Sequence, residues 1–341
     1  MSWRHVPDPV RAASPGALRP TGDRRPGRRT VLRAALATAA GLAGVAGVAG
    51  GGCTADDTLD RLDIACGEPG GTYIQFGRLL GGAAVAEGLA RTSTALVTAG
   101  SVDNLARLRT GSAGLAMCLA DSARESAWTP AAIGRVYQNY LQVVVPAGSP
   151  VTSVEQLRGR PVSIGAPGSG TAATTRRVFG ALGLLDAGSR RVEVSELVLA
   201  EAIRRLRAGT LAALVFSSGI PIPALTAVAA QFPVRLLDLT EVFDRLTQVQ
   251  REVYARTTVP AATYDMPADV TTVGVANLLL SRPDLPEDTA ARLVDLVLGR
   301  ARDLVPPPST GIQYLTQQTL VDTFPISLHA GAARRYRELH G

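Results

Sequence analysis

Short apolar segments alternate with helical segments along most of this chain, and this alternation limits the possible fold more than any other feature. The body opens with an apolar run at 62–66, a glycine-rich turn and a segment whose apolar residues recur at helical spacing. A run at 92–100, a short helix that starts on Ser101 and a third run at 113–121 follow. Strands that are apolar almost throughout, separated by helices, predict a parallel sheet covered by helices on both faces.

The same pattern returns further along the chain. An apolar run at 141–150 begins a crossing, and 160–183 predicts a strand, a glycine-rich turn and a helix. Further strands and one helix extend to residue 239, and 271–282 predicts a strand that returns to the first unit. The C-terminal part is predicted to be helical, with a proline and two acidic residues where its first helix starts.

A middle segment that folds as its own α/β unit, with both flanking segments joined in another, predicts two lobes with a cleft between them. The predicted limits are a leader at 1–53, a linker at 54–61, a first lobe made of 62–146 and 269–341, and a second lobe at 147–268. Ligands of open α/β sheets bind at the carboxyl ends of the strands, so the cleft is the predicted site.

Basic residues concentrate in the leader. Residues 1–52 hold eight of the 35 arginines and two of the 29 acidic residues, so 27 of each remain afterwards. The net charge of +6 therefore belongs to the leader, which argues against a body that binds nucleic acid. Arg28 and Arg29 precede the apolar stretch Ala34–Gly52, a pattern that predicts an export signal of the twin-arginine kind. A permanent membrane anchor is the alternative, because the stretch would just reach across a bilayer.

The leader ends in the letters AGVAGGGC, small residues followed by Cys53. This ending resembles a bacterial lipobox, in which the cysteine carries lipid and becomes the new N-terminus. Gly50 stands where a lipobox prefers Leu or Val, so a secreted protein or another form of tether is the alternative. A lipid on Cys53 would hold the body at the outer surface of the membrane.

Several kinds of chemistry find no support in the residue types present. The chain has no lysine, which removes Schiff-base chemistry, lysine bases and the phosphate-binding P-loop lysine. Only His329 and His340 follow the leader, so a serine–histidine pair would need one of them to reach a glycine-rich turn. No cluster of His, Cys and acidic residues has the spacing of a metal site. We therefore expect no catalytic residues, no metal and no cofactor.

Two glycine-rich turns, 67–71 and 165–170, each follow a strand and open a helix. With their following threonines they have the patterns G-x-x-G-G-T and G-x-x-G-x-G-T, neither of which is a nucleotide-binding fingerprint. Uncovered backbone N–H groups, hydroxyl groups and a helix N-terminus together suit an anion. The turns therefore predict a binding site for a small acidic solute.

Five segments resemble the TAXI-type substrate-binding subunits of TRAP transporters. They contain the letters GEPGGTYIQFG, TAGSVDNLARLRTGSAGLAMCLAD, GRPVSIGAPGSGT, VPAATYDMPADVTTVGVANLLLSRPDLPED and FPISLHAGAARRYRELHG. The likeness runs from about residue 62 to the C-terminus. It implies a class II periplasmic-binding-protein fold, in which two α/β lobes joined by a hinge close on a small organic acid or amino acid. It also implies delivery of that solute to a separate membrane permease.

Two departures from that family affect what can be transferred. Cys66 stands where the family often has Thr, and Leu119 and Ala120 precede Asp121 where the family often has a Gln. Fold and role survive these changes, but the identity of the ligand does not transfer. Glutamate-like amino acids and dicarboxylates both remain candidates, and Arg78, Arg176 and Arg177 are the candidate cations for such a cleft.

The candidate ligand-binding residues lie at predicted strand ends and helix starts. Each has a structural alternative: Ser169 as an ordinary helix cap, Tyr73 as a core residue, and Ser101 and Asn104 as helix caps. His329 is expected to pack or to cap a helix. The candidates are Gly70, Gly71, Thr72, Tyr73, Ser101, Asn104, Ser169, Gly170, Thr171, Ser217, Ser218, Gly219 and Tyr264.

Cys66 and Cys118 lie near the ends of the first and third predicted strands, which are neighbours in a sheet ordered 2-1-3. In an oxidising compartment the two would form a disulfide if their side chains pointed suitably, and two buried free thiols are the alternative. The whole chain is thus predicted to be an exported, lipid-anchored solute-binding protein at the outer or periplasmic face of the membrane. A binding protein that serves a membrane sensor kinase, or an extracytoplasmic enzyme, is the alternative.

Overall fold

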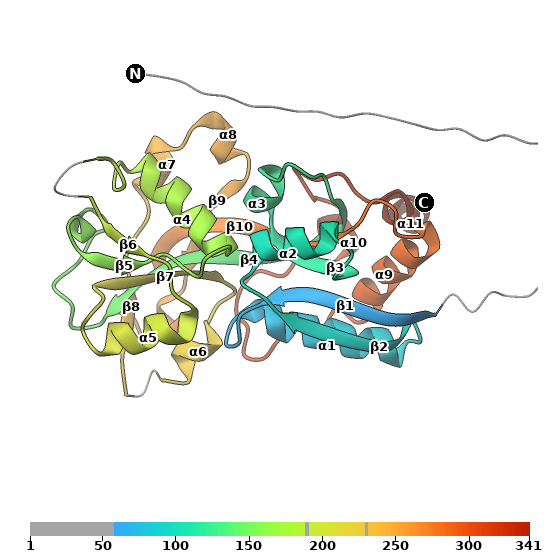
Figure 1. Cartoon of the computed structure of the whole chain (residues 1–341), viewed down its shortest axis with the longest axis horizontal. Coiled ribbons are helices and arrows are strands. Elements are labelled where there is room, and N and C mark those ends of the chain that lie inside the picture. Colours follow the sequence, from blue (N-terminus) through green and yellow to red (C-terminus); the bar gives the residue numbers. More distant parts are fainter. Residues whose placement is uncertain (1–57, 188–190, 229–230) are drawn as a thin grey trace, which may run out of the picture. The chain divides into compact units, whose positions relative to one another are not determined.

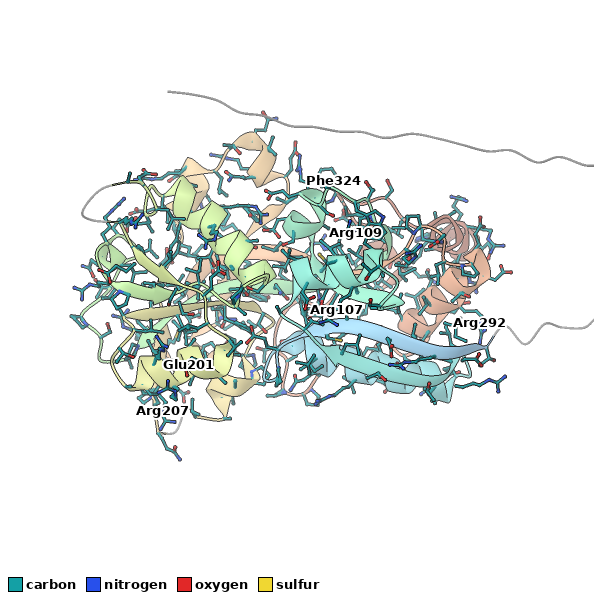
Figure 2. The ribbon with its side chains drawn as sticks, in the orientation of Figure 1. Arg107, Arg109, Glu201, Arg207, Arg292 and Phe324 are labelled. Atoms are coloured by element: carbon teal, nitrogen blue, oxygen red, sulfur yellow. The ribbon has the colours of Figure 1, made fainter. Side chains whose placement is uncertain are left out.

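The computed structural model describes residues 58–187, 191–228 and 231–341 (Figure 1). The predicted leader at 1–53 and its Cys53 lie outside the described residues. Residues Thr54–Gly341 form one compact unit. Within the described ranges, no helix has both the length and the apolar character needed to span a bilayer.

Strands and helices alternate as expected over most of the body. The strands are β1 (Leu59–Gly67), β2 (Ala90–Val97), β3 (Leu115–Leu119), β4 (Ala131–Pro146), β5 (Pro161–Ser163), β6 (Glu193–Ser195), β7 (Ala213–Ser218), β8 (Val234–Leu236), β9 (Tyr254–Val259) and β10 (Val270–Ser281). The longer helices are α1 (Thr72–Ala86), α2 (Ser101–Arg109), α4 (Gly170–Ala181), α5 (Leu199–Arg207), α9 (Glu287–Gly299) and α11 (Ala330–His340). The short ones are α3 (Ala120–Arg124), α6 (Pro223–Thr226), α7 (Val242–Arg245), α8 (Gln248–Arg251), α10 (Gln317–Leu320) and the 3-10 turns η1 (Glu155–Leu157) and η2 (Ala261–Thr263).

The strands form one sheet in the order β2-β1-β3-β10-β4-β7-β5-β6, with β8 paired to β4 and β9 paired to β10. The parallel strands β1, β2 and β3 form one end, which we call the first half. The parallel strands β5, β6 and β7, with β8, form the second half. The long antiparallel strands β4 and β10 run through both halves and connect them (Figure 1).

Both halves follow one plan. In the first half the order is β2-β1-β3-β10-β4, and in the second it is β6-β5-β7-β4-β8. In each half the fourth position is held by one of the two long strands that run through both halves, β10 in the first and β4 in the second. The predicted order 2-1-3 and the predicted plan of two related α/β units are confirmed. The exact lobe limits, 62–146 with 269–341 and 147–268, stay a prediction.

Apolar residues cover both faces of the sheet in each half, because successive side chains of a strand point to opposite faces. In the first half, α1, α9 and α11 pack on one face around Ile64 and Met117, and α2 and α3 pack on the other around Ala65 and Ala116. In the second half, α4 and α7 cover one face, and α5 and α6 cover the other. Continuous apolar strands were the correct signal for this two-sided burial.

Two strands begin earlier than the sequence predicts, and a third, β9, was not predicted at all. β1 begins at Leu59, so the end of the predicted linker 54–61 is strand. β4 begins at Ala131, ten residues before the predicted run at 141–150. These ten residues were not predicted as strand, because Arg135 and Gln138 interrupt the apolar pattern. Both find partners from the C-terminal segment: Arg135 stacks on the Tyr314 ring, and the Tyr314 hydroxyl donates to Gln138 Oε1 at 2.6 Å.

The two cysteines of the body are buried free thiols. Cys66 belongs to the core under α1, whereas Cys118 belongs to the core under α2, on the opposite face of the sheet. The strands β1 and β3 that carry them are paired neighbours, but the two side chains point to opposite faces of the sheet. The possible disulfide between Cys66 and Cys118 is therefore not formed in this structure.

Candidate functional site

A pocket lies where the carboxyl ends of β1, β3 and β7 meet the starts of α1, α2 and α4. Figure 1 shows α2 and α4 approaching each other end to end above the sheet. The pocket leaves about 40 Å³ for the centres of water molecules, which is enough to hold water. It is lined by Gly67, Glu68, Gly71, Thr72, Tyr73, Ala99, Gly100, Ser101, Leu119, Ser169, Gly170, Thr171, Phe216, Ser217 and Ser218.

Glycine allows the starts of α2 and α4 to touch. Gly100 precedes α2 with φ +115°, a conformation that side chains rarely adopt. A Cβ atom on Gly170 would overlap Ser101 Oγ, so the first turn of α4 has no space for a larger residue there. The backbone N–H of Asp103 donates to the carbonyl of Gly168 at 3.2 Å, which joins α2 to the second glycine-rich turn.

Hydroxyl groups from both halves line the pocket and bond to one another. Thr72 Oγ1 lies 2.9 Å from Ser218 Oγ, and the Ser217 backbone N–H donates to Thr171 Oγ1 at 3.1 Å. Ser169 caps α4, since its Oγ accepts from the Ala172 N–H at 3.0 Å. Ser169 is thus both a helix cap and a lining residue, so the two readings of the sequence are compatible.

Glu68 is the charged residue of this pocket. Its carboxylate oxygen Oε2 accepts from the Leu199 backbone N–H at 2.6 Å, where α5 begins in the opposite half. Burial raises the pKa of Glu68 above its ordinary value, and the bond from Leu199 opposes that rise. The three helix starts contribute partial positive charge to the same space. The pocket therefore offers positive backbone groups on one side and a single carboxylate on another.

The arginines that the sequence offered as cations lie elsewhere. None of Arg78, Arg176 and Arg177 lines the pocket. Arg176 pairs with Glu196 at 2.5 Å, and Arg177 pairs with Asp121 at 2.8 Å and with Glu125. An anion in this pocket would therefore be held by backbone N–H groups and hydroxyls rather than by a guanidinium group.

Asp121 forms a second connection between the halves, beside the pocket. It lies in α3 and is 2% exposed, and it accepts from three donors of the second half or of β9. Thr174 Oγ1 donates at 2.6 Å, Arg177 Nη1 at 2.8 Å and the Tyr254 hydroxyl at 2.9 Å. Burial and the negative charge of Asp121 raise the pKa of Tyr254, so its hydroxyl keeps the proton that it donates.

Nine of the thirteen predicted site residues meet in this pocket. Binding of a ligand by them stays a prediction. They come from the starts of three helices and the end of β7: Gly71, Thr72, Tyr73, Ser101, Ser169, Gly170, Thr171, Ser217 and Ser218.

Four predicted residues do not line the pocket. Asn104 is fully buried and uses its amide to bind the carbonyls of Cys66 and Met117 at 2.6 and 2.7 Å. Tyr264 is buried under α6, where its hydroxyl donates to Gln142 and accepts from the Ile222 N–H. Gly70 and Gly219 adjoin the pocket, but their neighbours form its wall.

The sequence interpretation missed six lining residues. Glu68 lay inside a quoted glycine-rich turn, and an acidic residue beside glycines was a signal for a charged site residue. Gly100 directly precedes a helix and was also open to prediction. The others, Gly67, Ala99, Leu119 and Phe216, carry no polar side chain that marks them.

His329 has the role expected of it. It precedes α11, is buried, and accepts from the Gly331 backbone N–H through Nδ1 at 3.2 Å, so it caps the helix. Within the described ranges, no three His, Cys, Asp or Glu residues lie together as a metal site would require.

A comparison with known protein families finds a match over most of the chain. A model of the NMT1-like family matches residues 64–339. The chain belongs to that family. This NMT1-like protein is also similar to solved binding-protein structures, and the predicted two-lobed α/β fold is confirmed by its own sheet order.

Three of those solved structures illustrate the range. The alkanesulfonate-binding protein SsuA from Xanthomonas axonopodis pv. citri, bound to MOPS, is 15% identical, with 82% of this chain and 84% of that chain covered and a TM-score of 0.43. The GluR0 ligand-binding core from Nostoc punctiforme, in complex with L-glutamate, is 17% identical (71% and 93% covered, TM-score 0.42). The arginine-, lysine-, histidine-binding protein ArtJ from Geobacillus stearothermophilus is 8% identical (71% and 91% covered, TM-score 0.45).

Proposed function

We propose that this NMT1-like protein is an extracytoplasmic solute-binding protein that captures a small amino acid and delivers it to a membrane permease. One observation carries the proposal. Three helix starts, a group of hydroxyls and one carboxylate converge on a single pocket between the two sheet halves. Such a set can hold a small zwitterion from all sides, and it offers no activated nucleophile for a reaction on it.

The charges of the pocket favour an amino acid over a dicarboxylate. The backbone N–H groups at the starts of α1, α2 and α4 suit one carboxylate. Glu68 supplies the negative charge that an α-ammonium group needs, and it would repel a second carboxylate placed beside it. Glutamate-like amino acids therefore fit better than dicarboxylates.

Capture requires the halves to move apart and close again. The pocket is small, with about 40 Å³ open to the centres of water molecules, and contacts such as Thr72–Ser218 and Glu68–Leu199 join its two walls. The strands β4 and β10 are the two long strands that run through both halves, so bending there would open the pocket. A ligand that binds the closed form more tightly than the open form is sufficient to drive closure.

The leader and the resemblance support a role for this binding activity in a transport system. The predicted export signal at 1–53 and the lipid on Cys53 would keep the body at the outer face of the membrane. The TAXI-like motifs support a TRAP-type permease as the partner that accepts the solute.

Thermal shift and calorimetry on residues 54–341, which form a compact unit, test the proposal. The panel contains the common L-amino acids, dicarboxylates and monocarboxylates. We expect one or a few amino acids to raise the melting temperature, since a ligand at a hundred times its Kd adds about 2.7 kcal/mol of stability. A panel in which only dicarboxylates bind would overturn the amino-acid assignment, and no binding at all would overturn the solute-binding role proposed here.

A further inference from the structure

Three buried polar side chains behind the pocket have atoms without hydrogen-bond partners. They are Tyr137 and Asn139 of β4 and Asn277 of β10, each at most 1% exposed. The Tyr137 hydroxyl, Asn139 Oδ1 and both side-chain polar atoms of Asn277 make no hydrogen bond of ordinary geometry, although Tyr137 and Asn277 lie near enough to interact. We call these three residues the polar compartment.

The three side chains share one face of the sheet. Asn277 lies directly opposite Tyr137 in the β4–β10 register, and opposed residues of an antiparallel pair point to the same face. Asn139 lies two residues along β4 from Tyr137 and therefore also points to that face. The polar compartment is thus a local cluster on the two strands that connect the halves.

Tyr73 connects the polar compartment to the pocket. It is half-buried, lines the pocket and packs edge-on against Tyr137, with 6.3 Å between ring centres. Its hydroxyl makes a long contact, 3.4 Å, with Ser101 Oγ and also interacts with the Asn139 side chain. On the other side, Asn139 Nδ2 reaches Ser217 Oγ of the pocket wall at 3.5 Å. Tyr73 therefore lies between the pocket and the polar compartment.

Leaving these groups unpaired costs folding free energy, because each has lost water without gaining a partner. The same fold satisfies a buried Asn elsewhere. Asn104 is fully buried and bonds Cys66, Met117 and Thr98 through both atoms of its amide. Unpaired amides next to a ligand pocket therefore indicate groups kept for a ligand rather than for the fold.

We propose that the polar compartment receives the uncharged polar end of the ligand side chain, such as the carboxamide of glutamine. This inference rests on the proposed function and narrows its substrate class. The Asn277 amide and the Tyr137 hydroxyl offer both donors and acceptors, which a carboxamide matches. A carboxylate would bury its charge there without a cation, with the negative charge of Asp121 close enough to act on Tyr73.

Calorimetry with L-glutamine, L-glutamate and L-methionine tests this, because the three have similar length and differ at the end of the side chain. We expect the unmodified body to prefer glutamine over both others by at least tenfold, about 1.4 kcal/mol. Asn277→Leu should remove the preference over methionine and raise the melting temperature. Tyr137→Phe, which deletes only an unpaired hydroxyl and keeps the ring, should act in the same directions.

Ser281→Ala is the matched control. Ser281 is also buried on β10 with an unpaired hydroxyl, but it pairs with Leu115 at the start of β3, whereas Asn277 pairs with Leu119 of the pocket wall. It should leave the preference unchanged. Two results would overturn this inference without affecting the proposed function. One is a preference for glutamine that survives both compartment variants, and the other is a lower melting temperature in both variants. Failure of the unmodified body to bind any amino acid would instead overturn the proposed function, and this inference with it.

Discussion

Glu68→Gln separates the charge of the pocket from its shape. The carboxylate of Glu68 accepts from the Leu199 N–H at 2.6 Å, and a glutamine can accept from the same donor. The substitution therefore keeps the contact between the halves and removes only the negative charge. If Glu68 binds the ligand ammonium group, the affinity for amino acids must fall while the fold is preserved.

The expected loss follows from the strength of a hydrogen bond to a charged group. Such a bond contributes about 1.5–3 kcal/mol, which corresponds to about a 10- to 150-fold increase in Kd. Stability should change in the opposite direction. Burial raises the pKa of Glu68 above its ordinary value of 4.5. As the pH rises from 4.5 through the raised pKa, ionisation of Glu68 therefore lowers the stability of the folded protein. Glutamine has no such cost, so the variant should be at least as stable as the parent at pH 7.

The assay is calorimetry at several pH values between 5 and 8, with glutamate and with glutarate, which lacks the amino group. For the parent we expect amino-acid affinity to fall as the pH drops through the pKa of Glu68, because the neutral acid no longer attracts the ammonium. The variant should lose that dependence, and its affinity for glutarate should be unchanged or higher. Equal loss of affinity for both compounds would refute the reasoning, since it would mean that Glu68 acts through shape or closure.

Three further predictions concern residues outside the pocket. Asp121→Asn should lower the stability by about 2 kcal/mol and shift the ligand-free protein toward a more open form. A larger radius of gyration in small-angle scattering would show the opening. An unchanged radius of gyration would argue that the contacts of Asp121 between the halves do not favour closure. Asn104→Ala should cost about 3 kcal/mol in urea unfolding because it removes three buried bonds, yet leave ligand selectivity unchanged. Cys66 and Cys118 should stay unreactive toward a thiol reagent at pH 8 until the protein unfolds, because burial raises the pKa of Cys66 to about 12; a mass two units lower without reductant would show a disulfide instead.

The sequence predicted those parts of the site that depend on local signals. Glycines before a helix mark places where backbone N–H groups stay uncovered, so Gly71, Ser169 and Gly170 were open to prediction. Asn104 of α2 was predicted to bind the ligand, but its side chain bonds to backbone carbonyls of β1 and β3. No local sequence pattern reveals contacts between residues so far apart in the chain. The first ten residues of β4 were missed for the same reason, since the partner of Gln138 comes from a segment far along the chain.

The crossing strands also explain why the fold tolerates unpaired groups where it does. Of the thirteen unpartnered buried side-chain polar atoms among the described residues, seven lie on β4 and β10. A strand that is apolar on both faces cannot shift against its neighbours without exposing apolar surface, which opposes movement. Amides and hydroxyls without fixed partners can exchange water for ligand as the halves separate and close. Asn139 and Asn277, which lie where β4 and β10 pass from one half to the other, would thus lower the cost of opening and add affinity on closure. On this argument Asn277→Leu should both stabilise the protein and slow its opening, which ligand dissociation rates would measure.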